Sequence, residues 1–182
     1  EPVSFDGEHY QLRDAVLRPT PLQRPHPPLM LGGGGKGILR RAGRWADILH
    51  MVPEIGKLGT TTLESVSAFG DDSVTEKLAL VREEAKAAGR PDGAVRYATT
   101  IFVYQPADSE EQAREAAEGA AAMFGITAEK FTRHPAVLAG TTEQMAEELD
   151  RRAKTHGLSL VALEASGMDG IRDFAKRIVV NG

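Results

Sequence analysis

The stretch LMLGGGGKG, residues 29–37, joins a short apolar run to four consecutive glycines. After it, Ile38, Leu39, Ala42 and Trp45 recur at helical spacing, which predicts a helix from about residue 37 to 46. A strand at 29–31, a tight turn and a helix N-terminus therefore follow one another. Backbone amides without neighbouring side chains, at the positive end of a helix dipole, suit a phosphate group. The alternative is a tight strand-to-helix connection that binds nothing.

The glycines fit the general nucleotide-binding motifs only in part. A Walker A loop fails because Met30 stands where its first glycine is needed and Gly37 where a Ser or Thr is needed. The dinucleotide fingerprint is formally met by Gly32, Gly34 and Gly37, and Glu54 follows the next predicted strand as a possible ribose-binding acid. A run of glycines satisfies that pattern easily, so an NAD(P)-binding Rossmann protein is the less favoured alternative.

Strand and helix patterns alternate along the chain. A β-hairpin is expected at residues 3–12 around the turn Asp6-Gly7, and a proline-rich connector follows up to residue 28. The predicted strands are 29–31, 46–52, 95–104 and 160–163. The predicted helices are 37–46, 73–88, 109–124, 128–132, 141–156 and 169–179. Residues 55–72, rich in Gly, Ser and Thr, are expected to form a loop over a site.

Four strands separated by helices predict an α/β fold with a parallel sheet. The strand segments are apolar at consecutive positions, as expected where both faces of a sheet are covered. We expect one domain over residues 1–182, with the hairpin and connector at 1–28 and four βα units at 29–182. The strands are expected to lie side by side in chain order, joined by right-handed crossovers.

Composition limits the partners of the chain. The net charge of −4 and the lack of a basic tract argue against nucleic acid. The absence of cysteine excludes disulfides, thiolate catalysis and cysteine-bound metals. No apolar run reaches the length of a membrane span, so we expect a cytoplasmic protein without a membrane partner. His9, His134 and His156 lack the spacing of a metal site, and no metal is expected.

Several motifs follow one another in a specific order. They are Gly7-Glu8-His9-Tyr10, Arg18-Pro19-Thr20-Pro21-Leu22-Gln23-Arg24-Pro25, Pro27-Pro28-Leu29-Met30-Leu31-Gly32-Gly33-Gly34-Gly35, Ala42-Gly43-Arg44-Trp45-Ala46-Asp47, Val137-Leu138-Ala139-Gly140-Thr141-Thr142-Glu143-Gln144-Met145 and Gly157-Leu158-Ser159. This succession resembles the luciferase-like monooxygenase family, particularly its members that depend on the deazaflavin coenzyme F420. The resemblance covers nearly the whole chain, and ordered motifs are more specific than one glycine pattern.

The resemblance implies a (β/α)8 barrel of the TIM type, of which this chain holds only the C-terminal half. Four predicted strands agree with this, because a complete barrel needs eight. The implied chemistry is hydride transfer or monooxygenation of a small organic substrate, with coenzyme F420, or alternatively FMN, as cofactor. A truncated relative that binds a flavin or merely folds, without turnover, is the alternative. A half-barrel is also expected to form a homo-oligomer or to pair with the missing half.

The resemblance also implies where the site lies. The cofactor is expected against Gly32, Gly33, Gly34 and Gly35, with Lys36 as an added charge. His50 and Met51 end the second predicted strand at the catalytic face of such barrels, which makes them candidates for the substrate pocket. Further candidates at strand ends are Gln105, Glu164 and Ser166. No catalytic acid or base is assigned, since the half of the barrel expected to supply it is absent.

Overall fold

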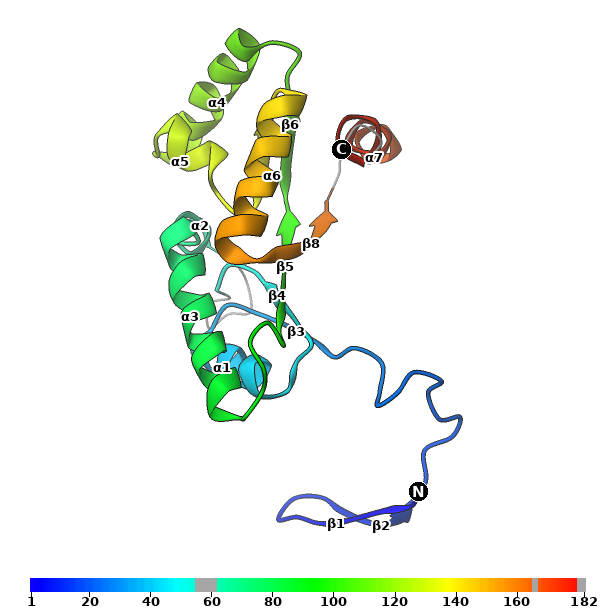
Figure 1. The fold of residues 1–182 in the computed structure, drawn as a ribbon. Helices are drawn as coiled ribbons and strands as arrows, with labels where there is room; N and C mark the ends of the chain where they lie inside the picture. Colours follow the sequence, from blue (N-terminus) through cyan, green and yellow to red (C-terminus); the bar gives the residue numbers. More distant parts are fainter. Residues whose placement is uncertain (55–61, 165–166, 180–182) are drawn as a thin grey trace.

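The computed structural model describes residues 1–54, 62–164 and 167–179. Its main sheet has four parallel strands, and neighbouring strands follow chain order (Figure 1). They are β3 (Met30–Gly32), β4 (Ile48–Met51), β5 (Arg96–Ile101) and β8 (Leu158–Leu163). The predicted order is thus confirmed. A dinucleotide-binding sheet reverses its strand order beside the first strand, and the order here argues against the Rossmann alternative.

The helices that follow these strands pack against one another in the same sequence. Helix α1 (Lys36–Trp45) packs on α3 (Asp71–Ala87), α3 contacts α6 (Thr142–His156), and α6 contacts the π-helical turn η1 (Ala175–Val179) that extends α7 (Gly167–Phe174). Between these helices and the sheet lies a core whose buried members include Leu39, Leu49, Met51, Val81 and Tyr97. Helices that ring a curved parallel sheet in chain order are the outer layer of a TIM-type barrel.

The other face of the sheet is largely open. Met30 on β3 and Leu160 on β8 point away from the core, and 52% and 38% of their surfaces are exposed. The expectation that both faces are covered is therefore wrong at Met30 and Leu160, whereas Ile48 and Ala98, their register partners on this face, are buried. In a complete barrel this is the inner face, and it is closed by the remaining strands.

One predicted strand is interrupted, and one strand was missed. The stretch 95–104 breaks at Phe102 into β5 and β6 (Val103–Pro106), and β6 pairs in parallel with β7 (Val137–Gly140). This second sheet carries α4 (Glu110–Phe124) and α5 (Ala128–Thr132) on its outer side. The expected loop at 55–72 contains a short helix, α2 (Leu63–Ser67), and α3 begins two residues earlier than predicted; residues 55–61 lie outside the described part.

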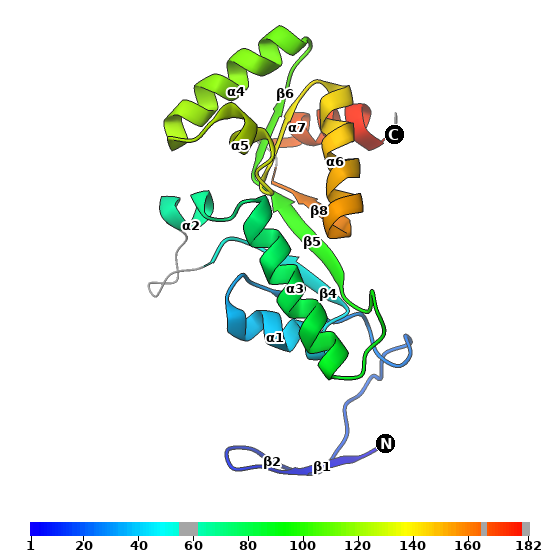
Figure 2. The same ribbon diagram turned by 60° about the vertical axis from the view of Figure 1, so that its left-hand side comes forward.

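The N-terminal hairpin consists of β1 (Val3–Asp6) and β2 (Gln11–Ala15), as the Asp6-Gly7 turn predicted. It stands away from the rest of the molecule, joined by the proline-rich connector (Figure 2). Large apolar side chains on this segment are exposed, namely those of Val3, Phe5, Tyr10, Leu12, Val16, Leu17 and Leu22. The segment therefore has the character of an arm that packs on something other than this half-barrel.

Candidate functional site

The glycine loop connects β3 to α1 at the C-terminal edge of the sheet. Gly35 is the N-cap of α1, and no side chain caps the helix there. The first turn contains no acidic residue, and Lys36, its first residue, is exposed. The amide of Gly33 donates to the carbonyl of His50 at 3.0 Å, which ties the loop to β4. The first turn of α1 thus carries no anionic side chain of its own, but the Glu54 carboxylate lies beside it, since its Oε1 is 3.4 Å from the Cβ position of Gly35.

The four glycines do two different things. Gly33 has a φ of +147°, and a Cβ on Gly34 would lie 2.4 Å from the carbonyl oxygen of Val52, so the turn itself requires these two. Gly32 and Gly35 are different, because the nearest atoms to a Cβ there lie 3.8 Å and 3.4 Å away. Space beside the loop is therefore left by Gly32, while the Glu54 carboxylate lies against Gly35 and Gly34 is buried against the segment after β4.

His50 lies beside this loop on the open face. Gly32 and His50 are partners in the register of β3 and β4, and partners in parallel strands point to the same face. The Nε2 atom of His50 lies 2.8 Å from the Oγ1 of Thr100 on β5. A Cβ on Gly32 would be 4.0 Å from Nδ1 of the imidazole. Gly32, His50 and Thr100 are thus neighbours on the open face, and we call these three residues the inner-face strip.

Met51 is not brought to this strip. Neighbouring residues of a strand point to opposite faces, and Met51 is 0% exposed in the core under α1 and α3. Thr100, in turn, was missed by sequence reasoning. It belongs to the run Thr99-Thr100-Ile101, and only the register between β4 and β5 shows which threonine faces His50.

The remaining candidates lie farther along the strands. Gln105 is on β6, and its Oε1 is buried without a hydrogen-bond partner in the described part of the chain. Glu164 directly follows β8 and lines an open pocket of about 440 Å³ with Tyr104 and Asp173. The Tyr104 hydroxyl donates to Asp173 at 2.7 Å; burial, with the Asp173 carboxylate, raises the pKa of Tyr104. Ser166 lies outside the described residues.

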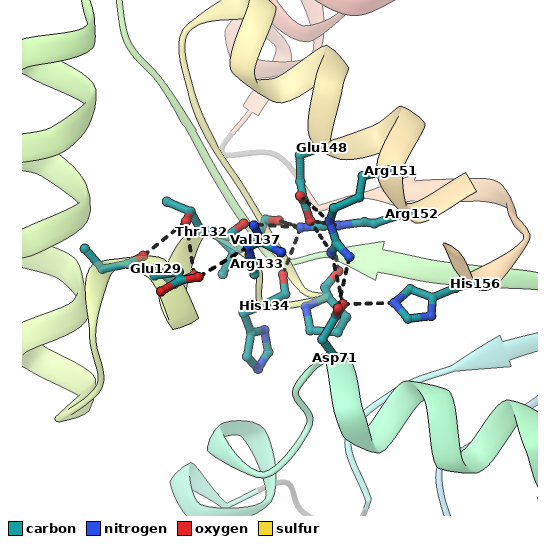
Figure 3. Close-up of polar contacts among 12 residues, drawn as sticks. Asp71, Glu129, Thr132, Arg133, His134, Val137, Glu148, Arg151, Arg152 and His156 are labelled. Carbon is teal, nitrogen blue, oxygen red and sulfur yellow. Dashed lines mark hydrogen bonds and ion pairs between the residues drawn. The ribbon is translucent and has the colours of Figure 1, made fainter. Parts of the chain in front are cut away.

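His134 and Arg152 are buried and structural. Arg152 is 2% exposed and donates to the backbone carbonyls of Val137 at 2.8 Å and His134 at 3.1 Å, and to the Glu148 carboxylate at 2.7 Å (Figure 3). The Nδ1 of His134 accepts from the amide of Ala136, and its Nε2–H donates to the carbonyl of Val66 at 2.8 Å. Both ring nitrogens are therefore used within the fold.

The same cluster ties α3 to α6. Arg151 donates to both carboxylate oxygens of Asp71, at 2.9 Å and 3.0 Å, and His156 lies 2.9 Å from Asp71 (Figure 3). Burial alone would raise the pKa of Asp71, but Arg151 and His156 together hold it below its ordinary value. His156 is thus an interhelical partner of Asp71 as well as a basic residue in the last turn of α6.

The described part of the chain holds neither a candidate metal cluster nor a membrane-spanning helix. Within residues 1–54, 62–164 and 167–179, no group of three or more His, Cys, Asp or Glu side chains is arranged to hold a metal ion. In the same ranges, no helix has the length and apolar character needed to cross a membrane.

Comparison with known proteins agrees with this geometry. A family model described as luciferase-like monooxygenase matches residues 1–173. An FMNH(2)-dependent dimethylsulfone monooxygenase from Pseudomonas putida is 32% identical over 111 residues, which are 61% of this chain and 25% of that protein. The structure of the coenzyme F420-dependent tetrahydromethanopterin reductase from Methanopyrus kandleri superposes with a TM-score of 0.66 at 15% identity, over 99% of this chain and 58% of that one.

A second solved structure gives the same result. The long-chain alkane monooxygenase LadA superposes with a TM-score of 0.66 at 14% identity, covering 99% of this chain and 46% of its own. The chain thus spans about half the length of these two solved structures and a quarter of the curated relative. Its fold is the C-terminal half of a TIM-type barrel.

Proposed function

We propose, since the chain belongs to the luciferase-like monooxygenase family, that it supplies the cofactor-loop half of an oxidoreductase that uses FMN or coenzyme F420. One observation carries the proposal: the uncapped N-terminus of α1 and the inner-face strip lie together on the open face, at the ends of β3, β4 and β5. Ligands of TIM-type barrels bind at this end of the strands.

The residues present fit such a cofactor. A phosphate or carboxylate on its polar chain would accept hydrogen bonds from the first amides of α1, and Lys36 would add a positive charge. The missing side chain of Gly32 leaves room for that chain, and the exposed Glu54 side chain, whose Oε1 lies beside Gly35, would turn away from an anionic group there. Apolar Met30 and Leu160 on the same face suit contact with the ring system. When bound, the cofactor supplies hydride transfer or oxygen activation.

His50 is the residue of this half that we assign to the reacting region. Thr100 fixes the orientation of the imidazole through Nε2, and Nδ1 has no hydrogen-bond partner in the described part of the chain. Nδ1 is therefore available to a polar group of the cofactor or of a small organic substrate. Met51, being buried on the other face, supports the strand beneath this site.

Cofactor titration of glycine-loop variants tests the proposal. The chain would be completed as a chimaera in which the N-terminal portion of the Pseudomonas putida relative precedes residue 1. Gly32→Val should weaken binding of FMN or F420 at least about tenfold, which is about 1.4 kcal/mol, because the new side chain fills the space beside the loop.

Lys36→Ala is the matched control and should cost less, since backbone amides make the main contact. Fluorescence quenching gives the affinities, and circular dichroism checks that each variant is folded. If folded Gly32→Val bound the cofactor as tightly as the wild type does, the glycine loop would not be part of the cofactor site.

A further inference from the structure

A cavity of about 340 Å³ lies beyond the ends of β4 and β5. Its walls come from the segment after β4, from α2, from the β6–β7 pair and from the α4–α5 region. They are formed mainly by apolar side chains, among them Val52, Phe102, Phe124, Ile126, Phe131 and Val137. We call this space the apolar cavity.

The polar groups in its wall are already satisfied. His134 lines the cavity, but both of its ring nitrogens are engaged with the backbone of Val66 and Ala136. Because Nδ1 accepts a hydrogen bond, it carries no proton; burial lowers the pKa of His134 against the opposing bond to Val66, and the nearby Arg152 lowers it further. Among the described lining residues, Ser67 alone brings a further polar side chain, and Ser67 is exposed. A bound group would therefore find apolar contacts rather than hydrogen bonds.

The position of the cavity links it to the inner-face strip. Val52 and Phe102 follow His50 and Thr100 by two residues on the same two segments of chain. Phe102 interrupts the strand between β5 and β6 and is 47% exposed, although it is large and apolar. A ligand that reaches His50 thus has the apolar cavity next to it, past the strand ends.

We infer that the apolar cavity binds the hydrocarbon part of the substrate, an alkyl chain or an aromatic ring, while the group that reacts lies at His50. This inference rests on the proposed function, because it assumes that the reacting centre is at the inner-face strip. The volume supports it: a dry cavity of about 150 Å³ accepts benzene, and this one is roughly twice as large. Burial of methylene groups supplies the binding free energy.

Binding of linear alcohols to the 182-residue chain, without cofactor, tests the inference. Butan-1-ol, hexan-1-ol and octan-1-ol are titrated by isothermal calorimetry. Affinity should rise about fourfold for each added methylene group. Ser67→Phe, which adds a bulky ring at an exposed position of the wall, should weaken octan-1-ol binding at least about tenfold.

Ala68→Phe is the matched control. Ala68 is the adjacent exposed residue, it does not line the cavity, and its replacement should leave the affinity unchanged. An affinity that does not depend on chain length, or one that Ser67→Phe leaves unchanged, overturns the inference; the second result would mean that the alcohols bind elsewhere, such as on the open sheet face.

The alcohol titration and the cofactor titration test the two proposals separately. If alcohol affinity rises with chain length and falls in Ser67→Phe, but the glycine loop binds no cofactor, the cavity is a hydrocarbon site and the proposed function is wrong. If the loop binds a cofactor but the chain binds no alcohol, the proposed function stands and the hydrocarbon site is wrong.

Discussion

A buried arginine connects three segments of this molecule. Arg152 extends from α6 to the backbone between α5 and β7, and its charge is balanced by Glu148 one turn earlier on the same helix. In the sequence, Glu148 and Arg152 form an ordinary i, i+4 pair, which is typical of a solvated helix face. Only the packing of α6 on the 132–137 segment makes it an internal ion pair.

Replacement of this arginine should be costly. Arg152→Met removes the hydrogen bonds of this guanidinium to the carbonyls of Pro135 and Val137, while Glu148 keeps Arg151 as a donor, and we expect a loss of about 2–4 kcal/mol in the free energy of unfolding. Arg133→Met is the control, since Arg133 makes an exposed pair with Glu129, and it should change stability by less than about 0.5 kcal/mol. Urea unfolding measures both. A similar small effect for the two variants would contradict the structural role of Arg152.

His134 should make stability depend on pH. Burial lowers its pKa in the folded protein, while the unfolded chain binds a proton near pH 6.5. The unfolded state therefore binds more protons just below that pH, and the folded state loses stability as the pH falls from about 7 to about 5. Urea unfolding of His134→Gln across this range should show a smaller decline. The wild type and the variant share the other four histidines. An equal decline in the two proteins would therefore show that His134 does not cause the pH dependence.

At the scale of elements, the contact between α1 and α3 depends on one glycine. A Cβ on Gly43 would lie 2.6 Å from the carbonyl oxygen of Val81 and 2.7 Å from the Cβ of Glu84. The backbone of α1 therefore approaches α3 more closely than any side chain permits. Gly119 on α4 is the opposite case, because it is exposed and nothing lies within 4 Å of its Cβ position.

The two glycines should respond oppositely to the same change. Gly43→Ala should destabilise the protein by about 1–3 kcal/mol through overpacking, although alanine is the better helix former. Gly119→Ala should stabilise it by up to about 1 kcal/mol. Thermal and urea unfolding compare them. If Gly43→Ala also stabilised the protein, α1 and α3 could not be packed as closely at Gly43 as the structure shows.

The helices and strands were largely predictable from the sequence. The exceptions all depend on how strands that are distant in the sequence pair with one another. Strand order followed from the alternation of local patterns, and the glycine turn was evident from residues 29–37. β7 was missed because Val137–Gly140 is short and is a strand only through its pairing with β6. The irregular register between β5 and β8 likewise turns Leu160 to the open face. The pairing of His50 with Thr100 depends on a register that no local pattern contains.

At the scale of the whole molecule, the open sheet is the dominant feature. In the described part of the chain, β3 and β8 are edge strands, and the face between them exposes apolar side chains. Unpaired edges and apolar surface favour association. We expect the 182-residue chain to form oligomers in light scattering and to bind a dye specific for apolar surface. A sharp monomer that melts cooperatively and binds no such dye would contradict the half-barrel.

We propose above all that a flavin-type cofactor lies against the glycine loop. The loop and the N-terminus of α1 are complete within this chain, so even weak contact is measurable by nuclear magnetic resonance. A nitrogen-15-labelled 182-residue chain is titrated with FMN and, separately, with F420. The amide signals of Gly32, Gly35 and Lys36 and the ring signals of His50 should shift together and saturate with one of the two cofactors. Shifts that cluster elsewhere, or none with either cofactor, would contradict it.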